Sequence, residues 1–368
     1  MKNVAKARVL VTRFPYKSQL GGEEMHTISL MRGFDKKGVE AFFMGSDGIL
    51  LDLFGKNGFS VKKAWLGKPP VTKAGLLVFT ILSPVLFVLA GWHLWKARKR
   101  WQVNVLYCLS FGEKLLMTPW ARIFGMKILW LEHARIGKWL ARNPWRHVYK
   151  FLSGWVTVVV TSNAMRPEIE GFAKNVEAIS CGVIVDKGVA LRDNVQKFLN
   201  SGFAVGTVAR LTVDKGVDMI AKLVHCKPDM RLIIVGDGPL RTAIEKMGNS
   251  GQIMVLDSMP RGELMSLYKA LDLFILGSTE MDPFGMVAAE AMWFGTPVLI
   301  TDKCGFSEDL HNGKEAFVVE AKFAALDKAV KKLMKHEGVR KGAGRRGQDF
   351  VRKNYKLKDM VDRFRRLL

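Results

Sequence analysis

The sequence predicts an α/β protein made of two Rossmann-like domains in tandem. The chain has 368 residues, which is more than one average domain needs. Short apolar strands alternate with helical segments up to about residue 180, and this is the doubly wound pattern. After a break at 181–200 the alternation starts again. We therefore expect domains over 1–183 and 184–345, and a helical tail over 346–368 that returns to the first domain.

The strands of the first domain are expected in short apolar stretches rich in β-branched residues. They are 7–14, 40–45, 103–110, 126–133 and 156–163. Parallel strands separated by helices form an open sheet, and such sheets bind ligands at the carboxyl ends of their strands.

The second domain repeats the strand-then-helix pattern. Its strands are expected at 203–210, 230–238, 252–258, 271–278 and 296–302. Two such domains in tandem are expected to face a central cleft. The chemistry should take place in that cleft, because the carboxyl ends of both sets of strands border it.

An apolar run at 74–95, AGLLVFTILSPVLFVLAGWHLW, contains no Asp, Glu, Lys or Arg. Its length meets the threshold of about 20 residues for a transmembrane helix. A membrane span would, however, split the strands of one sheet between two compartments. We therefore expect a monotopic element, a helix or a helical hairpin that dips into one leaflet, with Pro84 as the place for a bend. A buried pair of core helices is the alternative, and a true span is the least favoured of the three.

The charge of the chain favours anionic partners. The net charge is +23, and residues 1–180 hold 27 Lys and Arg against 11 Asp and Glu. Between Leu53 and Gly112 there are nine bases and no acid. Such a surface attracts nucleic acid, phosphates or an anionic membrane. Next to the apolar run each base would contribute about 1 kcal/mol on anionic headgroups. A nucleic-acid-binding protein is the alternative, but it offers no reason for the pattern of residues at 282–298, which is described below.

The cysteines and the N-terminus favour a cytoplasmic protein. Cys108, Cys181, Cys226 and Cys304 are widely scattered and form no C-x-x-C pair, so we expect reduced, mostly buried thiols. The first residues, MKNVAKARVLVTRF, lack the long apolar core of a signal peptide. The expected location is the inner face of the cell membrane, with peripheral or monotopic attachment.

Two loops of the second domain carry residues suited to phosphate. Arg210 and Lys215 follow the strand that ends near Val208, and two cations there suit a diphosphate. The loop VGDGPLR places Gly236 and Gly238 in a tight turn into a helix, a signal that is weak alone.

The stretch DPFGMVAAEAMWFGTPV, residues 282–298, is more specific. Gly285 lets a ligand approach the start of a helix, where free N–H groups and the helix dipole favour a phosphate. Glu290 lies about one and a half turns into that helix, where its carboxylate can accept bonds from a ribose diol. Asp282 precedes the helix and can accept bonds from another polyol. An acid at each end of a diphosphate site fits a nucleotide-sugar.

On these motifs the second domain resembles the donor domain of retaining glycosyltransferases of the GT-B fold, family four, also called glycosyl transferases group 1. The family motif E-P-F-G-x-x-x-x-E-A-x-x-x-G-x-P-V matches here from Asp282 onward, and the resemblance covers roughly 200–320. The resemblance implies that the donor contacts Arg210, Lys215, Gly236, Asp282, Phe284, Gly285, Met286 and Glu290. One departure is that Asp282 replaces the first glutamate, which in the family contacts the donor sugar; Glu280 is a second candidate for that role, but the register favours Asp282.

The first domain resembles the family more loosely. The stretch SQLGGEEMHTISLMRGFDKKG is similar to its N-terminal glycine loop and the helix that follows, so Gly21 and Gly22 are expected near the donor diphosphate. His133 follows a strand where the family often has an active-site histidine near the transferred sugar. The alternative is a structural histidine, and His26 is a weaker candidate for the same site.

The resemblance implies a retaining transfer by front-face attack, in which the leaving phosphate helps to deprotonate the acceptor. His133, Asp282, Arg210 and Lys215 are the expected catalytic residues. No D-x-D motif is present, so we expect no metal and no cofactor; the two cations and the helix start near Gly285 would stabilise the leaving diphosphate.

The acceptor is expected to be lipid-linked or a glycolipid, because an apolar run lies in the domain that would bind it. The partners are then a nucleotide-sugar, that acceptor and an anionic membrane surface, with no nucleic acid. The alternatives are a nucleotide-sugar epimerase of the same fold and a non-catalytic membrane scaffold.

Overall fold

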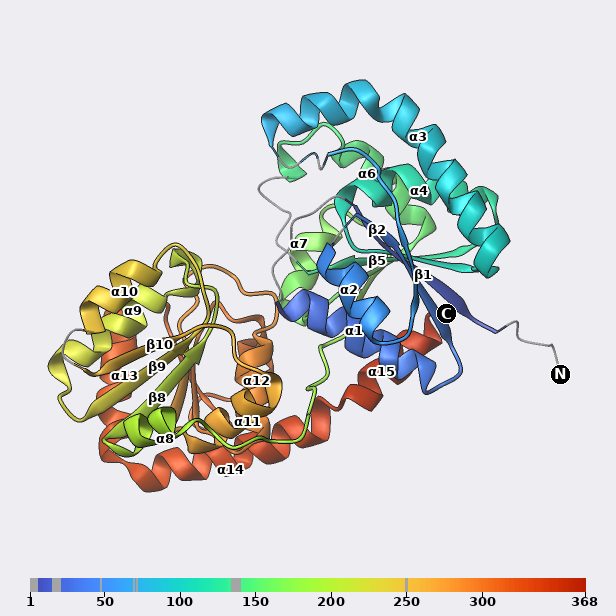
Figure 1. Cartoon of the computed structure of the whole chain (residues 1–368). Helices are drawn as coiled ribbons and strands as arrows, with labels where there is room; N and C mark the ends of the chain where they lie inside the picture. Colours follow the sequence, from blue (N-terminus) through green and yellow to red (C-terminus); the bar gives the residue numbers. More distant parts are fainter. Residues whose placement is uncertain are drawn as a thin grey trace. The chain divides into compact units, whose positions relative to one another are not determined.

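The computed structural model describes residues 6–14, 21–46, 48–68, 70, 72–133, 140–248 and 251–368, and for 225–226 the backbone only. The chain forms two compact units (Figure 1). Unit 1 comprises Met1–Gly182 together with Leu357–Leu368, and unit 2 comprises Val183–Lys356. Each unit contains one parallel sheet with helices around it, as the sequence predicts.

Unit 1 is built on a seven-stranded parallel sheet in the order β3-β2-β1-β4-β5-β6-β7. The strands are β1 (Arg8–Arg13), β2 (Glu40–Gly45), β3 (Ser60–Lys63), β4 (Val105–Cys108), β5 (Lys127–Glu132), β6 (Thr157–Val160) and β7 (Val176–Ala178). The helices are α1 (Gly22–Asp35), α2 (Gly48–Lys56), α3 (Lys73–Trp101), α4 (Phe111–Ile123), α6 (Arg146–Leu152), α7 (Arg166–Glu170) and α15 (Leu357–Arg366).

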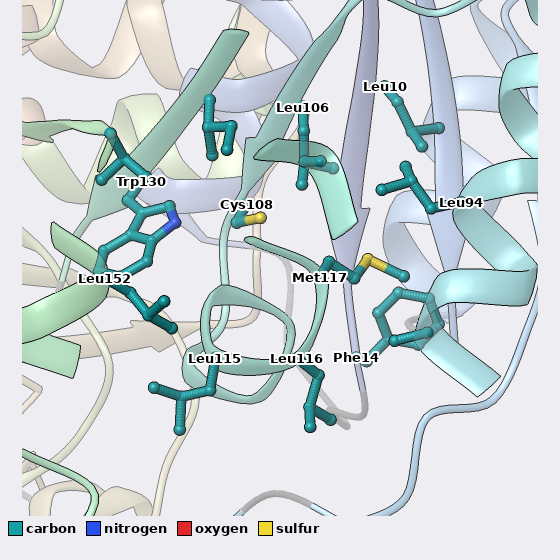
Figure 2. Packing of buried hydrophobic residues seen from close by; sticks show 14 of the residues in the cluster. Leu10, Phe14, Leu94, Leu106, Cys108, Leu115, Leu116, Met117, Trp130 and Leu152 are labelled. Carbon is teal, nitrogen blue, oxygen red and sulfur yellow. The ribbon is translucent and has the colours of Figure 1, made fainter. Parts of the chain in front are cut away.

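The sheet of unit 1 has a hydrophobic core on each face. Successive side chains of a strand point to opposite faces, so Val9 and Val11 of β1 enter one core while Leu10 enters the other. The first core lies under α1 and α15. The second lies under α3 and α4, and Figure 2 shows Leu10, Leu94 and Met117 in it.

The apolar run of the sequence lies in α3, one continuous helix of 29 residues. Of the two expected forms, a helix or a helical hairpin, the run has the single helix; the hairpin was wrong, and so was the alternative of a buried helix pair. Pro84 lies inside the helix and cannot donate to the carbonyl of Thr80. The hydroxyl of Ser83 donates to that carbonyl at 2.8 Å, which explains how the helix continues past the proline.

Helix α3 packs on α4 through small and aromatic residues. A Cβ on Gly91 would lie 2.5 Å from the ring of Trp120, so the two helices approach closely at this glycine. The indole Nε1 of Trp120 donates to the carbonyl of Phe87 at 2.8 Å. This contact fixes which side of α3 faces the core.

Unit 2 is built on a six-stranded parallel sheet in the order β10-β9-β8-β11-β12-β13. The strands are β8 (Phe203–Val208), β9 (Met230–Val235), β10 (Ile253–Leu256), β11 (Leu273–Leu276), β12 (Val298–Thr301) and β13 (Phe317–Val319). The helices are α8 (Asp193–Asn200), α9 (Val217–Lys222), α10 (Arg241–Met247), α11 (Arg261–Ala270), α12 (Met286–Trp293), α13 (Phe323–Lys335) and α14 (Glu337–Asn354).

The C-terminal tail is divided between the two units. Helix α14 belongs to unit 2, where Gly344 lies so close to Gly295 that an added Cβ would be 2.4 Å from its carbonyl oxygen. Helix α15 belongs to unit 1, where Val361 and Phe364 are buried in the core under α1. The division therefore comes at Lys356–Leu357, about ten residues after the boundary expected from the sequence, because α14 packs on α12.

The close packing at Gly91 gives a stability prediction. Gly91→Val should lower the free energy of unfolding by about 1–3 kcal/mol, because the new side chain would overlap Trp120. Gly55→Ala on α2 is the matched control, since nothing lies within 4 Å of its Cβ position, and alanine should stabilise that helix slightly. Urea unfolding of the two variants measures both effects. Equal stability of Gly91→Val and the parent protein would contradict the packing of α3 on α4.

Candidate active site

The loop after β8 holds the two cations that the sequence singles out, and they differ in environment. The side chain of Arg210 is 64% exposed, with Nη2 3.7 Å from Oδ2 of Asp214. Lys215 is mostly buried, and its Nζ donates to Oδ2 of Asp282 at 2.6 Å. The structure thus brings Lys215 and Asp282 together, while Arg210 stays at the surface of the same loop.

Asp282 lies at the carboxyl edge of the sheet, where both its backbone and its carboxylate make hydrogen bonds. Its N–H donates to the carbonyl of Lys303 at 2.7 Å, and its own carbonyl accepts from the N–H of Gly305 at 2.8 Å. Its second carboxylate oxygen accepts from the N–H of Phe284 at 3.3 Å. The carboxylate is therefore fixed just ahead of α12, with one oxygen directed at an ammonium group.

Gly285 starts α12 in a conformation that favours glycine. Its φ is +87°, and an added Cβ would lie 2.4 Å from Sγ of Cys304. The N–H of Ala288 donates to the carbonyl of Gly285 at 2.9 Å. The N–H groups of Met286 and Val287 precede this first bond of the helix, so the start of α12 near Met286 suits an anion. The ring of Phe284 is buried between Phe306 and Tyr355, so this residue can reach a donor through its backbone only.

Glu290 lies in the middle of α12, and each oxygen of its carboxylate accepts a hydrogen bond. The residue is 4% exposed. Oε1 accepts from Nη2 of Arg261 at 3.0 Å, and Oε2 accepts from the hydroxyl of Tyr268 at 3.1 Å. Burial raises the pKa of Glu290, whereas the charge and hydrogen bond of Arg261 oppose that rise. An ionised carboxylate has about four acceptor positions, so two remain for a diol.

The guanidinium of Arg261 is itself fixed. Nε lies 3.2 Å from Oδ2 of Asp186, and Nη2 also donates to the carbonyl of Ile184 at 2.7 Å. The sequence reasoning missed Arg261 and Tyr268. Their spacing of seven residues places both on one face of α11, which is the only signal that the sequence offers.

The glycine turn after β9 is tightly packed against the loop after β8. Gly236 has a φ of +146°, and an added Cβ would lie 2.0 Å from the carbonyl oxygen of Ala209. The N–H of Leu211 donates to the carbonyl of Asp237 at 2.9 Å. These contacts hold the backbone that precedes Lys215.

The glycine loop of unit 1 is described from Gly21 onward. Gly21 and Gly22 are exposed at the start of α1, and the N–H of Gly21 donates to Oε2 of Glu24 at 3.0 Å. Oε1 of that buried glutamate pairs with Nη1 of Arg13 at 2.8 Å. The preceding residues, 15–20, lie outside the described part of the chain.

His133 follows β5 and contacts the second candidate histidine, His26. The two ring centroids are 4.8 Å apart, edge to face. Burial lowers the pKa of His26 to about 4. Burial also lowers the pKa of His133, and the nearby His26, Arg13 and Lys114 lower it further. Both rings are therefore neutral at pH 7, so His133 suits hydrogen bonding to a sugar better than charge stabilisation.

A buried ion pair that the sequence reasoning missed lies at the end of β5. Nζ of Lys114 is 2.6 Å from Oε1 of Glu132, which also accepts from the hydroxyl of Tyr149 at 2.7 Å. Lys114 also donates to the carbonyl of Leu131 at 2.6 Å. These bonds fix the strand end that carries His133.

The candidate residues form two sets. The set in unit 2 comes from the loops after β8, β9 and β11 and from α12. Its members are Arg210, Lys215, Gly236, Asp282, Phe284, Gly285, Met286 and Glu290. Unit 1 holds Gly21, Gly22 and His133. Within the described ranges, no group of three or more His, Cys, Asp or Glu side chains is arranged to hold a metal ion.

The bond between Arg261 and Glu290 predicts a pH effect on ribonucleotide binding. Arg261→Gln removes the cation that opposes the raised pKa, so Glu290 should protonate at a higher pH and stop accepting from a ribose. Affinity for ribonucleoside diphosphates should fall about tenfold at pH 7. As the pH is lowered, binding should also be lost at a higher pH than in the parent protein. Calorimetry from pH 5 to 8 measures both effects.

Two controls accompany that measurement. Arg192→Gln removes an arginine whose Nε pairs at 2.7 Å with Glu263, on the same helix as Arg261, and should change neither quantity. A 2′,3′-dideoxynucleotide lacks the diol, so Arg261→Gln should leave its affinity unchanged. An equal loss for both nucleotides would mean that Arg261 has only a structural role.

Comparison with known proteins shows which family and which fold the chain resembles. Residues 192–350 match the family model of Glycosyl transferases group 1. The chain is 25% identical over 175 residues to the capsular polysaccharide biosynthesis glycosyltransferase CapM of Staphylococcus aureus. That alignment covers 45% of each protein, so the chain spans less than half the length of this curated relative.

The solved structures that resemble the protein cover both units. A glycosyltransferase from Rickettsia africae has a TM-score of 0.81 at 17% identity, covering 99% of this chain and 98% of that one. Anabaena HepE in complex with UDP and glucose has a TM-score of 0.78 at 18% identity, covering 98% of both chains. The whole chain therefore has the two-domain α/β fold of the GT-B glycosyltransferases, and residues 192–350 of it match the glycosyl transferases group 1 family.

Proposed function

We propose that the protein transfers a sugar from a nucleoside-diphosphate sugar to a hydroxyl group of an acceptor, with retention of the anomeric configuration and without a metal ion. The observation that carries this proposal is the arrangement at the carboxyl edge of the sheet in unit 2. This edge carries Lys215, Asp282, the start of α12 and Glu290. Hydrogen bonds hold three of the side chains: Lys215 donates to Asp282, which also accepts from the N–H of Phe284, and Arg261 donates to Glu290. The family match of residues 192–350 supports the proposal, as does the resemblance to HepE, which binds UDP and glucose.

The parts of the donor are assigned by chemistry. The diphosphate lies at the start of α12 near Gly285, where Arg210 and Lys215 supply positive charge. The ribose diol bonds to Glu290, and the transferred sugar bonds to Asp282. In this assignment the ammonium group of Lys215 donates to a phosphate oxygen of the bound donor, and its hydrogen bond with Asp282 becomes weaker.

The transfer breaks the bond between the anomeric carbon and the leaving phosphate oxygen. The acceptor oxygen forms its bond on the same face of the sugar, and its proton passes to the leaving diphosphate. Negative charge grows on that diphosphate, so Arg210, Lys215 and the N–H groups of α12 stabilise the transition state. From the family resemblance we assign to His133 the orientation of the transferred sugar.

The acceptor is proposed to be lipid-linked or a glycolipid at the cytosolic face of a membrane, as in the synthesis of cell-envelope polysaccharide. The long apolar helix α3 of unit 1 and the basic segment around it support this. The relative CapM, named for capsular polysaccharide biosynthesis, supports a glycan product.

The role of Lys215 predicts a loss of turnover. Lys215→Met should lower the rate of nucleotide release about 10²- to 10³-fold, because a cation is removed from the leaving group. Release should be measured across a panel of nucleotide-sugars, with liposomes that carry extracted lipid-linked sugars. Lys222→Met is the control, since Lys222 is on the neighbouring helix α9 and pairs with Asp218. Unchanged release in Lys215→Met would overturn the donor assignment, and an inverted product would exclude retention.

The role of His133 gives a separate prediction. His133→Ala should lower turnover while leaving nucleotide affinity unchanged, because the ring is proposed to contact the sugar and not the nucleotide. His147, exposed on α6, serves as the control histidine. Full turnover of His133→Ala would show that His133 is structural.

A further inference from the structure

Helix α3 carries a second apolar face, opposite to the one that packs on unit 1. Ile81, Val85 and Val88 are 67%, 66% and 66% exposed. The outer row, as we call this face, consists of Leu77, Ile81, Val85, Val88, Trp92 and Trp95, all exposed in the structure. Steps of three and four residues place them along one line of a helix.

The packed face of α3 follows the same spacing on the other side. Its members are buried in the core of unit 1 and include Phe79, Leu86, Ala90, Leu94, Ala97 and Trp101. An exposed helix of a soluble protein normally has a polar face toward solvent. Here no charged residue lies between 74 and 95. Only 22% of the most apolar 18-residue stretch of the helix is buried. A continuous exposed apolar row of this kind indicates an interaction surface.

The C-terminal end of the outer row is bordered by cations stacked on its tryptophans. Nζ of Lys96 is 3.9 Å from the ring centroid of Trp92, and Nζ of Lys99 is 4.2 Å from that of Trp95. Lys62, from β3, lies 5.7 Å from Trp92. Tryptophan and lysine together suit the boundary between acyl chains and headgroups of a membrane.

We propose that the outer row of α3 binds the surface of an anionic lipid bilayer, with the helix axis parallel to the membrane plane. The tryptophans and aliphatic side chains enter one leaflet, and Lys62, Lys96 and Lys99 contact acidic headgroups.

The topology of unit 1 excludes a span. Helix α3 connects β3 to β4, and these two strands belong to one parallel sheet. Both ends of α3 must therefore stay on the side of the membrane where the sheet is. The buried face of α3 packs on α4 over the same length that a span would expose to lipid.

The charge around α3 favours a bilayer over a second copy of the chain. Nine bases and no acid lie between Leu53 and Gly112. Two copies that met through this face would bring these cations together, and like charges repel. Acidic headgroups neutralise them. The inference deepens the proposed function by naming the surface that approaches a lipid-linked acceptor, but vesicle binding needs neither donor nor acceptor, so either proposal can fail alone.

The test is flotation of the full chain with vesicles of phosphatidylcholine alone or with 30% phosphatidylglycerol. The protein should float with the anionic vesicles and stay behind with the neutral ones. The triple variant Ile81→Ser, Val85→Ser, Val88→Ser should lower binding at least tenfold. Replacing Lys96 and Lys99 with Gln should lower it about fivefold for each lysine.

A matched control changes three exposed apolar residues of unit 2 to Ser, namely Val189, Phe323 and Val339, and should leave binding unchanged. Thermal unfolding shows whether each variant is folded. Equal binding of the α3 triple variant and the parent, or equal binding to neutral vesicles, would overturn the proposal. The parent protein could instead fail to bind vesicles and sediment as a dimer that the triple variant abolishes. That result would assign the outer row to a second copy of the chain and overturn the proposal.

Discussion

Every strand pairing in the two sheets is parallel, and the remaining structure depends on this constraint. Parallel neighbours need a crossover connection, so helices cover both faces of each sheet. All carboxyl strand ends then lie along one edge. Arg210 and Lys215 after β8, the glycine turn after β9 and Asp282 after β11 are far apart in sequence, yet this edge gathers them. The same constraint makes α3 a crossover helix between β3 and β4.

The elements that the sequence predicts well are the buried central strands. Stretches such as 232–235 and 273–276 are continuously apolar, because both faces of a parallel strand are buried. The edge strands β3, β7 and β13 were not predicted. β3 reads SVKK and is largely exposed, and β7 and β13 have three residues each, so neither composition nor length distinguishes them from loops. The position of α14 in unit 2 depends on its contact with α12, which no local pattern encodes.

The site residues were predicted by motif, but their bonds were not. The sequence assigned Lys215 to a diphosphate and Asp282 to a sugar, and the structure places them in one ion pair. Both side chains are mostly buried, and a buried charge that loses its partner is costly. A diphosphate at the start of α12 would give Lys215 a new anion. Asp282 would then need hydroxyl donors, which a sugar supplies. In the proposed function the pair would couple the two halves of the donor, and Asp at this position, one methylene shorter than Glu, would set how far that carboxylate reaches.

Glu290 shows why a long-range contact decides the chemistry of a motif residue. Burial raises the pKa of Glu290 and so favours the neutral carboxyl, which would be a poorer acceptor for a diol. Arg261 and Tyr268 come from α11 and hold the carboxylate with one bond to each oxygen. Arg261 is in turn held by Asp186 and the carbonyl of Ile184, near the beginning of unit 2. In the proposed function, a ribose at this site would meet a carboxylate fixed by residues from two other segments, α11 and the beginning of unit 2. The proposed role of the motif at 282–298 therefore requires the fold to bring these two segments to α12.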